Sequence, residues 1–271
     1  MKRGIYLRCC VGLWLLILAG MAGADERSDI GLGEREGLSL TLGLEYASGD
    51  YGTSSTTDLW QVPFGVDYVK GNVSAGIYSS LLSAKSSGAI IVSSSMTHMT
   101  KLTTSSTAGS KASGIGDINM YATYQLPQAA GSEIAYHVTG RIKLGTADEK
   151  KGLGTGENDY ALEGGLVMPF EKVYLFGSVG YQVNGDSATV NYDDVLYANA
   201  GATYPMGKGR SLGAMLEVAQ AATPGFDAPA QATVFYNQEL DKRKDLFFYL
   251  SVGLSNGSPD SAVGALLTIW L

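Results

Sequence analysis

The sequence is poor in the residues that support covalent and metal chemistry. It contains two cysteines and two histidines in 271 residues, namely Cys9, Cys10, His98 and His137. Both cysteines fall in an N-terminal segment that is typical of an export signal. The chain beyond that segment therefore offers no disulfide, no thiolate zinc site and no cysteine nucleophile.

Two further absences narrow the class of protein. Beyond its N-terminal segment the sequence contains no run of about 18 apolar residues, so no helical membrane span is predicted. Basic residues do not predominate either, because the formal net charge is −7. A surface that binds nucleic acid through its phosphates must be basic. Nucleic acid is therefore not an expected partner.

The N-terminal segment has the three parts of a signal peptide. Its positive start, apolar stretch and small-residue cleavage site are Lys2, Arg3 and Arg8, then Cys9 to Leu18, then Ala22, Gly23 and Ala24. The apolar stretch is too short for a retained membrane helix, the alternative, which needs roughly 20 residues. We expect residues 1–24 to be removed on export and residues 25–37 to form a short periplasmic segment.

Apolar and polar residues alternate along the rest of the chain, and no stretch shows a helical stripe. Between Leu38 and Tyr46, for example, a leucine stands at every second position up to Leu44. A period of two is typical of strands with one apolar face. Twelve strands are predicted, at 38–46, 60–68, 73–77, 118–126, 134–144, 160–168, 173–183, 196–204, 212–218, 232–236, 246–254 and 263–271. An even number is what bacterial transmembrane barrels require.

The predicted connectors alternate between short and long. The short ones lie near 70–71, 127–132, 169–172, 205–211 and 240–245, and the long ones near 48–58, 85–114, 145–158, 184–193, 223–229 and 255–260. Short periplasmic turns and longer outer loops are typical of outer-membrane barrels. Residues 38–271 are therefore expected to form an all-β, transmembrane, antiparallel up-and-down β-barrel in the outer membrane of a Gram-negative bacterium.

Aromatic residues on the apolar parity form two groups near the strand ends. The outer group is Tyr46, Trp60, Tyr160 and Tyr181, and the inner group is Tyr68, Tyr124 and Tyr204. Two aromatic belts mark the two interfaces of a membrane. A soluble β-sandwich or a secreted barrel, the alternative fold, explains the alternation but neither the belts nor the connector lengths.

The final segment, SAVGALLTIWL, is itself an alternating strand. We expect it to pair with the first strand and close the sheet, because every backbone donor and acceptor must be paired in lipid. Its apolar parity also resembles the C-terminal pattern that the outer-membrane assembly machinery reads. Leu271 departs from that pattern, which usually has Phe or Trp at this place.

Two motifs resemble a known family. The stretch SGIGDINMYATYQL contains Gly114, Gly116 and Asp117, and the stretch RIKLGTADEKKGLGTGENDYAL contains Lys143, Leu144, Thr146, the tetrapeptide LGTG at 153–156 and Asp159. They resemble the G-x-G-D, K-x-P-T-G and L-G-T-G elements of the outer-membrane transporter family named for the meta-cleavage pathway of phenol degradation (MetA-pathway phenol degradation-like). Gly145 and Ala147 depart from that family's proline and glycine. The resemblance implies passage of small, aromatic or hydrophobic compounds across the outer membrane.

No stretch carries a convincing cofactor or metal motif. The glycine-rich stretches 114–116 and 152–156 lack the Lys-Ser/Thr and the helix of a phosphate loop, so turns or bulges are expected there. A calcium site could be built from Asp148, Glu149, Glu157 and Asp159, whose oxygens suit that ion. Their spacing is not that of an EF-hand, and a solvated loop with Lys150 and Lys151 explains them better. We predict no cofactor and no metal.

An outer-membrane hydrolase is the least favoured alternative. Acyl transfer needs a nucleophile beside a histidine base and an orienting acid. His98 lies in a Ser/Thr-rich loop, 93–110, and His137 lies on the polar parity near Thr139 and Arg141 with no acid partner marked in the sequence. We therefore predict that the protein is not an enzyme and that His137 is a polar lumen residue.

Charged residues on the inward parity are the predicted pore lining. They are Glu45, Asp67, Asp117, Arg141, Lys143, Glu163, Glu217 and Glu239. Asp117, Arg141, Lys143 and Glu163 fall on neighbouring strands and are expected to meet in the outer half of the lumen. Either they form a salt-bridge lattice that stiffens or plugs the barrel, or they create a transverse field that orders polar solutes.

A lumen of twelve strands should be narrow, because eight strands are filled by side chains while 16–18 leave an open channel. The long connector 85–114 is a candidate constriction, and its apolar stretch 89–92 could fold inward or touch lipopolysaccharide. We predict an outer-membrane channel that passes small solutes, aromatic or hydrophobic ones included, by passive diffusion. Its expected partners are the lipid bilayer, lipopolysaccharide and the assembly machinery. The alternative is a structural or adhesive barrel without useful conductance, and the sequence leaves the oligomeric state open.

Overall fold

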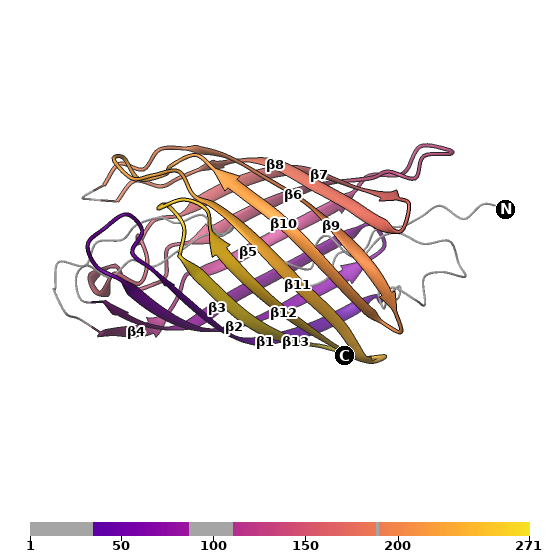
Figure 1. Ribbon diagram of the computed structural model, residues 1–271, viewed down its shortest axis with the longest axis horizontal. Helices are drawn as coiled ribbons and strands as arrows, with labels where there is room; N and C mark the ends of the chain where they lie inside the picture. Colours follow the sequence, from indigo (N-terminus) through magenta and orange to yellow (C-terminus); the bar gives the residue numbers. More distant parts are fainter. Residues whose placement is uncertain (1–34, 87–110, 188–189) are drawn as a thin grey trace.

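A computed structural model describes residues 35–86, 111–187 and 190–271 of the protein (Figure 1). The predicted signal peptide, most of the segment 25–37, most of the connector 85–114 and His98 lie outside the described residues. The elements are β1 (Gly37–Gly49), β2 (Thr57–Lys70), β3 (Val73–Ser86), β4 (Lys111–Ile115), β5 (Ile118–Gln125), β6 (Ala135–Leu144), the 3-10 turn η2 (Glu149–Lys151), β7 (Asp159–Phe170), β8 (Val173–Val183), β9 (Val195–Gly207), β10 (Arg210–Ala219), β11 (Ala230–Asp241), β12 (Lys244–Gly253) and β13 (Ser261–Trp270). None of the described helical residues forms a helix that is long and apolar enough to cross a membrane.

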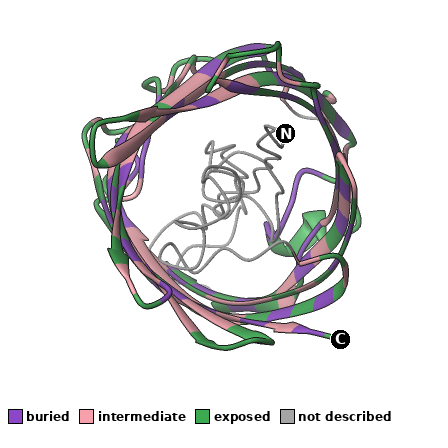
Figure 2. Cartoon of the chain, turned by 90° about the vertical axis from the view of Figure 1, so that its right-hand side faces the viewer, coloured by how far each residue is buried: buried purple, intermediate pink, exposed green. Residues whose placement is uncertain are grey.

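The strands form one closed antiparallel sheet. β1 pairs with β2 on one side and with β13 on the other, where Ser39 lies opposite Trp270 and Ser48 opposite Ser261. β4 and β5 both pair with β3, along its outer and inner parts, so the ring has twelve strand positions. Seen along its axis, the sheet is a ring of strands (Figure 2). The predicted all-β up-and-down barrel is confirmed.

The prediction was wrong at the start of the fourth barrel strand. β4 lies inside the segment 85–114 that was predicted as a connector, and β3 also extends into it as far as Ser86. The sequence of β4, KASGI, is small and polar and shows no apolar alternation. Its backbone nevertheless pairs with β3, with Ala112 opposite Ala84. The strand breaks at Gly116 and Asp117 and resumes as β5.

The two faces of the sheet differ in chemistry, as the alternation predicts. Large apolar side chains such as Leu42, Leu162 and Leu250 are exposed on the outer face, whereas threonines on the inner face are buried. The inner hydroxyls pair across strands, with Thr123 Oγ1 lying 2.8 Å from Thr139 Oγ1. A closed sheet that is apolar on its whole outer face is suited to lipid, because the ladder satisfies the backbone groups that lipid cannot.

The predicted aromatic groups lie at the two ends of this outer face. Trp60, Tyr160 and Tyr181 are exposed near one end of their strands, and Tyr68, Tyr124 and Tyr204 are exposed near the other end. The ring of Tyr46 packs 4.9 Å from that of Trp60, centroid to centroid. Tyr136, which the sequence analysis did not place in a group, is exposed at the inner end as well. The membrane interfaces are therefore marked on both sides of the apolar face.

The connectors alternate in length as predicted, except that the inner connector 126–134 is longer than the outer connectors 50–56 and 254–260. Two-residue turns at 71–72, 171–172, 208–209 and 242–243 join strands at the inner end. Several of these turns contain a positive φ, as at Gly71, Glu171 and Lys208, which matches the twist of a tight hairpin. The longer connectors, including 50–56, 145–158, 184–194, 220–229 and 254–260, lie at the outer end, as Figure 1 shows.

Glycines allow several inward-facing rings to lie against the wall. These rings and glycines are Tyr78 on Gly65, His137 on Gly165, Phe176 on Gly201, Tyr197 on Gly180, Phe235 on Gly213 and Tyr249 on Gly264. A Cβ atom at any of these glycines would overlap the ring. The rings therefore cover the backbone of the neighbouring strand, which is a close approach that only glycine permits.

Candidate functional site in the barrel lumen

Seven of the eight charged residues predicted as pore lining lie on the inward parity of their strands. The eighth, Asp117, lies in the short break between β4 and β5. Asp67, Asp117, Arg141, Lys143 and Glu163 are buried, and Glu45, Glu217 and Glu239 are half-buried. The structure does not bring Asp117, Arg141, Lys143 and Glu163 into a single cluster. It divides them between two ion-pair groups, which lie at different heights on the same neighbouring strands, β6 and β7.

The first group surrounds Lys143. Its Nζ lies 2.9 Å from Asp159 Oδ2 and 3.5 Å from Asp117 Oδ2, and it donates to Thr155 Oγ1 at 3.1 Å. The lysine side chain is fully buried. A buried ammonium needs such partners, because an unpaired charge is costly away from water. We call these four residues the lysine cage.

The lysine cage holds the connector 145–158 inside the outer rim. Asp117 Oδ1 accepts from the backbone N–H of Ala147 at 2.9 Å, and Ile118 N–H donates to Thr146 Oγ1 at 3.0 Å. Leu153 is fully buried and packs with Ala147 against inward-facing side chains of β2, β3 and β4, including Leu82. The turn η2 of this connector is visible within the ring of strands (Figure 2).

This placement corrects the interpretation of the connector's acidic residues. Asp159 is not part of a solvated loop, because it lies in β7 and pairs with Lys143. Asp148 accepts from the backbone N–H of Lys151 and pairs with that lysine's Nζ at 3.4 Å. Among the described residues, no group of three or more His, Cys, Asp or Glu is arranged to hold a metal ion. The alternation alone could have assigned Asp159 to the inward face, since it shares the parity of Glu163.

The second group surrounds Glu163. Its Oε1 lies 3.6 Å from Arg141 Nη2 and 3.9 Å from His137 Nε2, and Tyr197 lies beside both Glu163 and Arg141. His137 therefore has the acidic neighbour that the sequence did not reveal. No described hydroxyl is hydrogen-bonded to His137, and its Nδ1 has no partner among the described residues. Among the described residues the group is an Arg141–Glu163 ion pair with His137 beside it, and no hydroxyl nucleophile is placed on the histidine.

Asp67 forms a third group with tyrosines, and no cation among the described residues pairs with it. Its Oδ1 accepts from the hydroxyl of Tyr121 at 2.6 Å and from the hydroxyl of Tyr78. The two rings are stacked with their centroids 6.0 Å apart, and Gly76 lies beneath them. The sequence analysis missed both tyrosines, although their parity places them on the inner face.

Glu45 and Glu217 also have neutral partners. Tyr249 donates its hydroxyl to Glu45, and Gln231 Nε2 donates to Glu217 Oε2 at 2.6 Å. Neither carboxylate forms a salt bridge within the described ranges. Since Arg141 and Lys143 are bound to their own acids, the lumenal face carries more acids than cations. In its outer part the arrangement resembles the predicted salt-bridge lattice, and beyond it lie acids whose partners among the described residues are neutral.

The inner mouth contains a further charged cluster, in which the predicted lining residue Glu239 meets two residues that were not predicted, Arg35 and Asp245. Arg35 Nη1 lies 2.5 Å from Asp245 Oδ2, and Arg35 Nη2 lies 2.8 Å from Glu239 Oε1. The guanidinium also lies 5.9 Å from the ring centroid of Trp270, whose Nε1 donates to Asp245. Arg35 falls within the predicted periplasmic segment 25–37. Arg35, two residues before β1, thus links the start of the barrel to β11, β12 and β13 at its seam.

The inner part of the lumen carries an apolar surface on one wall. Phe176, Phe235, Phe247 and Tyr249 form a chain of rings whose centroids are 5.8–6.4 Å apart. We call these four residues the aromatic arc. They pack in one buried cluster with Met215 and others. The lumen therefore offers a polar, charged outer part and an aromatic surface below it.

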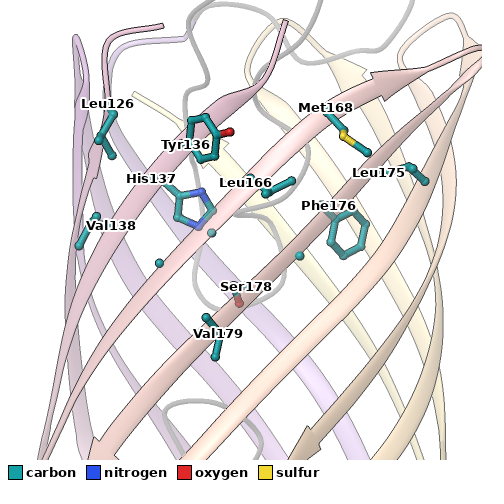
Figure 3. Close-up of a pocket in the computed structure, with 13 residues that line it drawn as sticks. Leu126, Tyr136, His137, Val138, Leu166, Met168, Leu175, Phe176, Ser178 and Val179 are labelled. Carbon is teal, nitrogen blue, oxygen red and sulfur yellow. The ribbon is translucent and has the colours of Figure 1, made fainter. Parts of the chain in front are cut away.

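The outer face carries one hollow of about 720 Å³ over β6, β7 and β8 (Figure 3). Gly164 and Gly177 line it together with apolar side chains such as Tyr136, Leu166 and Val179. The backbone ladders of β6 with β7 and of β7 with β8 continue across this region. The hollow is thus a depression in the lipid-facing wall and not an opening through it.

No protein-family model matches the sequence, and no curated protein sequence matches it. Several solved structures resemble this fold. The COG4313 outer membrane channel from Pseudomonas putida F1 is 12% identical with a TM-score of 0.67, over 93% of this chain and 100% of that chain. The NanC porin is 9% identical with a TM-score of 0.54, over 86% and 100%. The CymD monoaromatic hydrocarbon channel is 13% identical with a TM-score of 0.50, over 96% and 97%.

The fold is that of the outer-membrane channels. These solved relatives are channels and porins in kind and not enzymes. A likeness at such low identity concerns the course of the backbone, because function depends on the residues of a site and not on the fold.

Proposed function

We propose that this chain is an outer-membrane channel that passes small compounds, aromatic or hydrophobic ones among them, by passive diffusion. The observation that carries the proposal is the contrast between the two faces of a closed sheet. The outer face is apolar, whereas the inner face combines charged groups with the aromatic arc. Similar barrels are named as channels, one of them for monoaromatic hydrocarbons.

We also propose membership of the phenol-degradation transporter family. In support, residues of its two motifs meet in space: Asp117 of the first motif contacts Lys143 and Ala147 of the second. A Cβ at Gly114 would touch Leu153, so that glycine permits the close approach of the two motifs. Residues that recur together in two distant stretches would be expected to share one site.

The proposal extends to export and insertion. We infer that residues 1–24 are a cleaved signal peptide, that 25–37 lie in the periplasm and that the assembly machinery inserts the barrel into the outer membrane of a Gram-negative bacterium. The exposed aromatic residues at both strand ends support a bilayer as partner. Lipopolysaccharide is proposed as the neighbour of the outer rim. Mass spectrometry of the mature N-terminus and fractionation of membranes test these assignments.

Planar-bilayer recording of purified, folded protein tests the channel itself. We expect discrete single-channel steps in KCl, and we expect Glu163→Gln to alter the cation/anion preference, because it removes an acid and frees Arg141. Reversal potentials across a salt gradient measure that preference. Folded protein without conductance steps would favour a structural or adhesive barrel, and unchanged reversal potentials would remove Glu163 from the selectivity-determining residues.

A further inference from the structure

The aromatic arc and two carboxylates lie on adjoining strands of the lumen. In the strand register, Tyr249 of β12 lies opposite Gly264 of β13, and Gly264 lies opposite Glu45 of β1. Because Gly264 has no side chain, Tyr249 reaches over it and donates its hydroxyl to Glu45. The arc therefore ends at a carboxylate.

Glu217 of β10 adds a second carboxylate above the same surface. It lies two residues from Met215, which packs in the buried cluster of the arc, and its electrostatic field reaches Tyr249. The partners of Glu45 and Glu217 within the described ranges are a phenol and an amide. Neither partner carries positive charge, so within the described ranges no cation neutralises either carboxylate.

A buried amide lies beside the middle of the arc. Asn237 lies on the same face of β11 as Phe235 and opposite Phe247 of β12. Its side chain is fully buried, and both its nitrogen and its oxygen lack a hydrogen-bond partner among the described residues. Buried polar atoms are ordinarily satisfied. An amide without partners beside an aromatic surface indicates a place where a solute can donate or accept.

We propose that the arc, Glu45, Glu217 and Asn237 form a lumenal binding site for organic cations, namely protonated amines with an apolar or aromatic body. This inference rests on the proposed channel function and names the solute class of that lumen. The ammonium group lies between the carboxylates and the face of Tyr249, where both attract positive charge. The apolar body covers the remaining rings, and a polar substituent reaches Asn237.

The other cations and acids of the lumen favour this class over anions and neutral arenes. Arg141 and Lys143 are bound to Glu163 and to the lysine cage, so they do not offset Glu45 and Glu217. A carboxylate solute would be repelled by Glu45 and Glu217, whose partners within the described ranges are neutral. A neutral arene would use the arc alone and would gain nothing from the two carboxylates.

Isothermal titration of the full-length, folded barrel in detergent with benzylamine, benzyl alcohol and benzoate tests the site directly. The three probes share one ring and differ in charge at the substituent. We expect benzylamine to bind about tenfold more tightly than benzyl alcohol, and benzoate to bind most weakly. Titration does not require conductance, so the site is tested even if no channel activity is found.

Variants separate the contributions. Glu45→Gln with Glu217→Gln should remove most of the preference for benzylamine over benzyl alcohol, whereas Phe247→Leu should weaken both probes. Glu133→Gln, at an exposed acid in the inner connector 126–134, is the matched control and should change neither. Circular dichroism and heat-dependent gel mobility verify that each variant is folded.

The outcomes distinguish the two proposals. Conductance in KCl with equal affinity for benzylamine and benzyl alcohol would retain the channel and overturn the cation site. Preference for benzylamine without conductance would retain the site and overturn the channel. A preference that survives in the double variant would show that other groups hold the ammonium, which also overturns the assignment.

Discussion

Removing the charge of Lys143 is the sharpest test of how the lumen is built. Lys143→Met keeps the length and apolar stem of the side chain but removes the ammonium that lies between Asp117 and Asp159. The two carboxylates then lose this ammonium, and Thr155 loses its donor. Breaking a buried ion pair by removing one partner costs about 3–5 kcal/mol, because it leaves a charge buried and uncompensated.

The expected loss of unfolding free energy is therefore about 3–5 kcal/mol for Lys143→Met. Lys151→Met is the matched control, since Lys151 also pairs with an aspartate, Asp148, at 3.4 Å. Those two side chains are 55% and 43% exposed. A surface pair of this kind contributes roughly 0–1 kcal/mol, so the control should differ little from the native protein.

Urea unfolding of the barrel in lipid vesicles, followed by tryptophan fluorescence, measures both variants. The free energy is obtained by linear extrapolation, and an unchanged slope indicates that the same surface is exposed. Adding Asp159→Asn to Lys143→Met should recover part of the loss, because it removes one of the stranded charges. A Lys143→Met barrel within about 1 kcal/mol of the native protein would refute the reasoning, because the cage would then be hydrated and not buried.

Three further predictions concern the wall, the lipid face and the seam. Gly165→Ala should lose about 1–3 kcal/mol of unfolding free energy, because its Cβ would overlap the ring of His137. Gly164→Ala is the control and should be neutral or gain up to about 1 kcal/mol, because its Cβ meets open space. Equal losses in urea titrations would argue against ring packing. Leu42→Arg should cost about 2–4 kcal/mol on the lipid-facing surface, measured by refolding into vesicles, and no loss would mean that this face does not meet lipid. Arg35→Lys should lower stability by about 3 kcal/mol, since an ammonium cannot bridge Asp245 and Glu239 as the planar guanidinium does; a melting temperature equal to that of the native protein would exclude a clamp at the seam.

The strands could be predicted because lipid imposes the same pattern on each of them. A residue that faces lipid must be apolar, so every spanning strand repeats the alternation seen in β1. β4 escaped prediction for the same reason. Apart from Ile115, its positions, including Ala112 and Ser113, are filled by small or polar residues, and its pairing with β3 uses backbone groups that leave no mark in the sequence.

Parity predicted which way the charged side chains point but not which of them pair. Pairing depends on register, which follows from hairpin turns and from the tilt of the strands. Lys143 lies directly opposite Asp159 of β7, so the register alone explains that ion pair. Glu163 lies opposite Thr139 yet reaches Arg141 along a diagonal. A diagonal contact of long side chains cannot be derived from strand order without the register.

The same pairing decides which charges a solute meets. In the outer part of the lumen, Arg141 and Lys143 form ion pairs with neighbouring acids. These ion pairs join adjacent strands and hold the connector 145–158 in place. The remaining field comes from acids with neutral partners, such as Glu45 and Glu217. Neutralising Glu217 should therefore reduce cation preference because it removes one negative charge from the lumen. Neutralising Glu163 should reduce it because Arg141 loses its acidic partner and its positive charge then acts on the solute. The two substitutions change the formal charge equally but act through different residues. In an Arg141→Gln background, neutralising Glu163 should therefore have no further effect, whereas neutralising Glu217 should have the same effect as before.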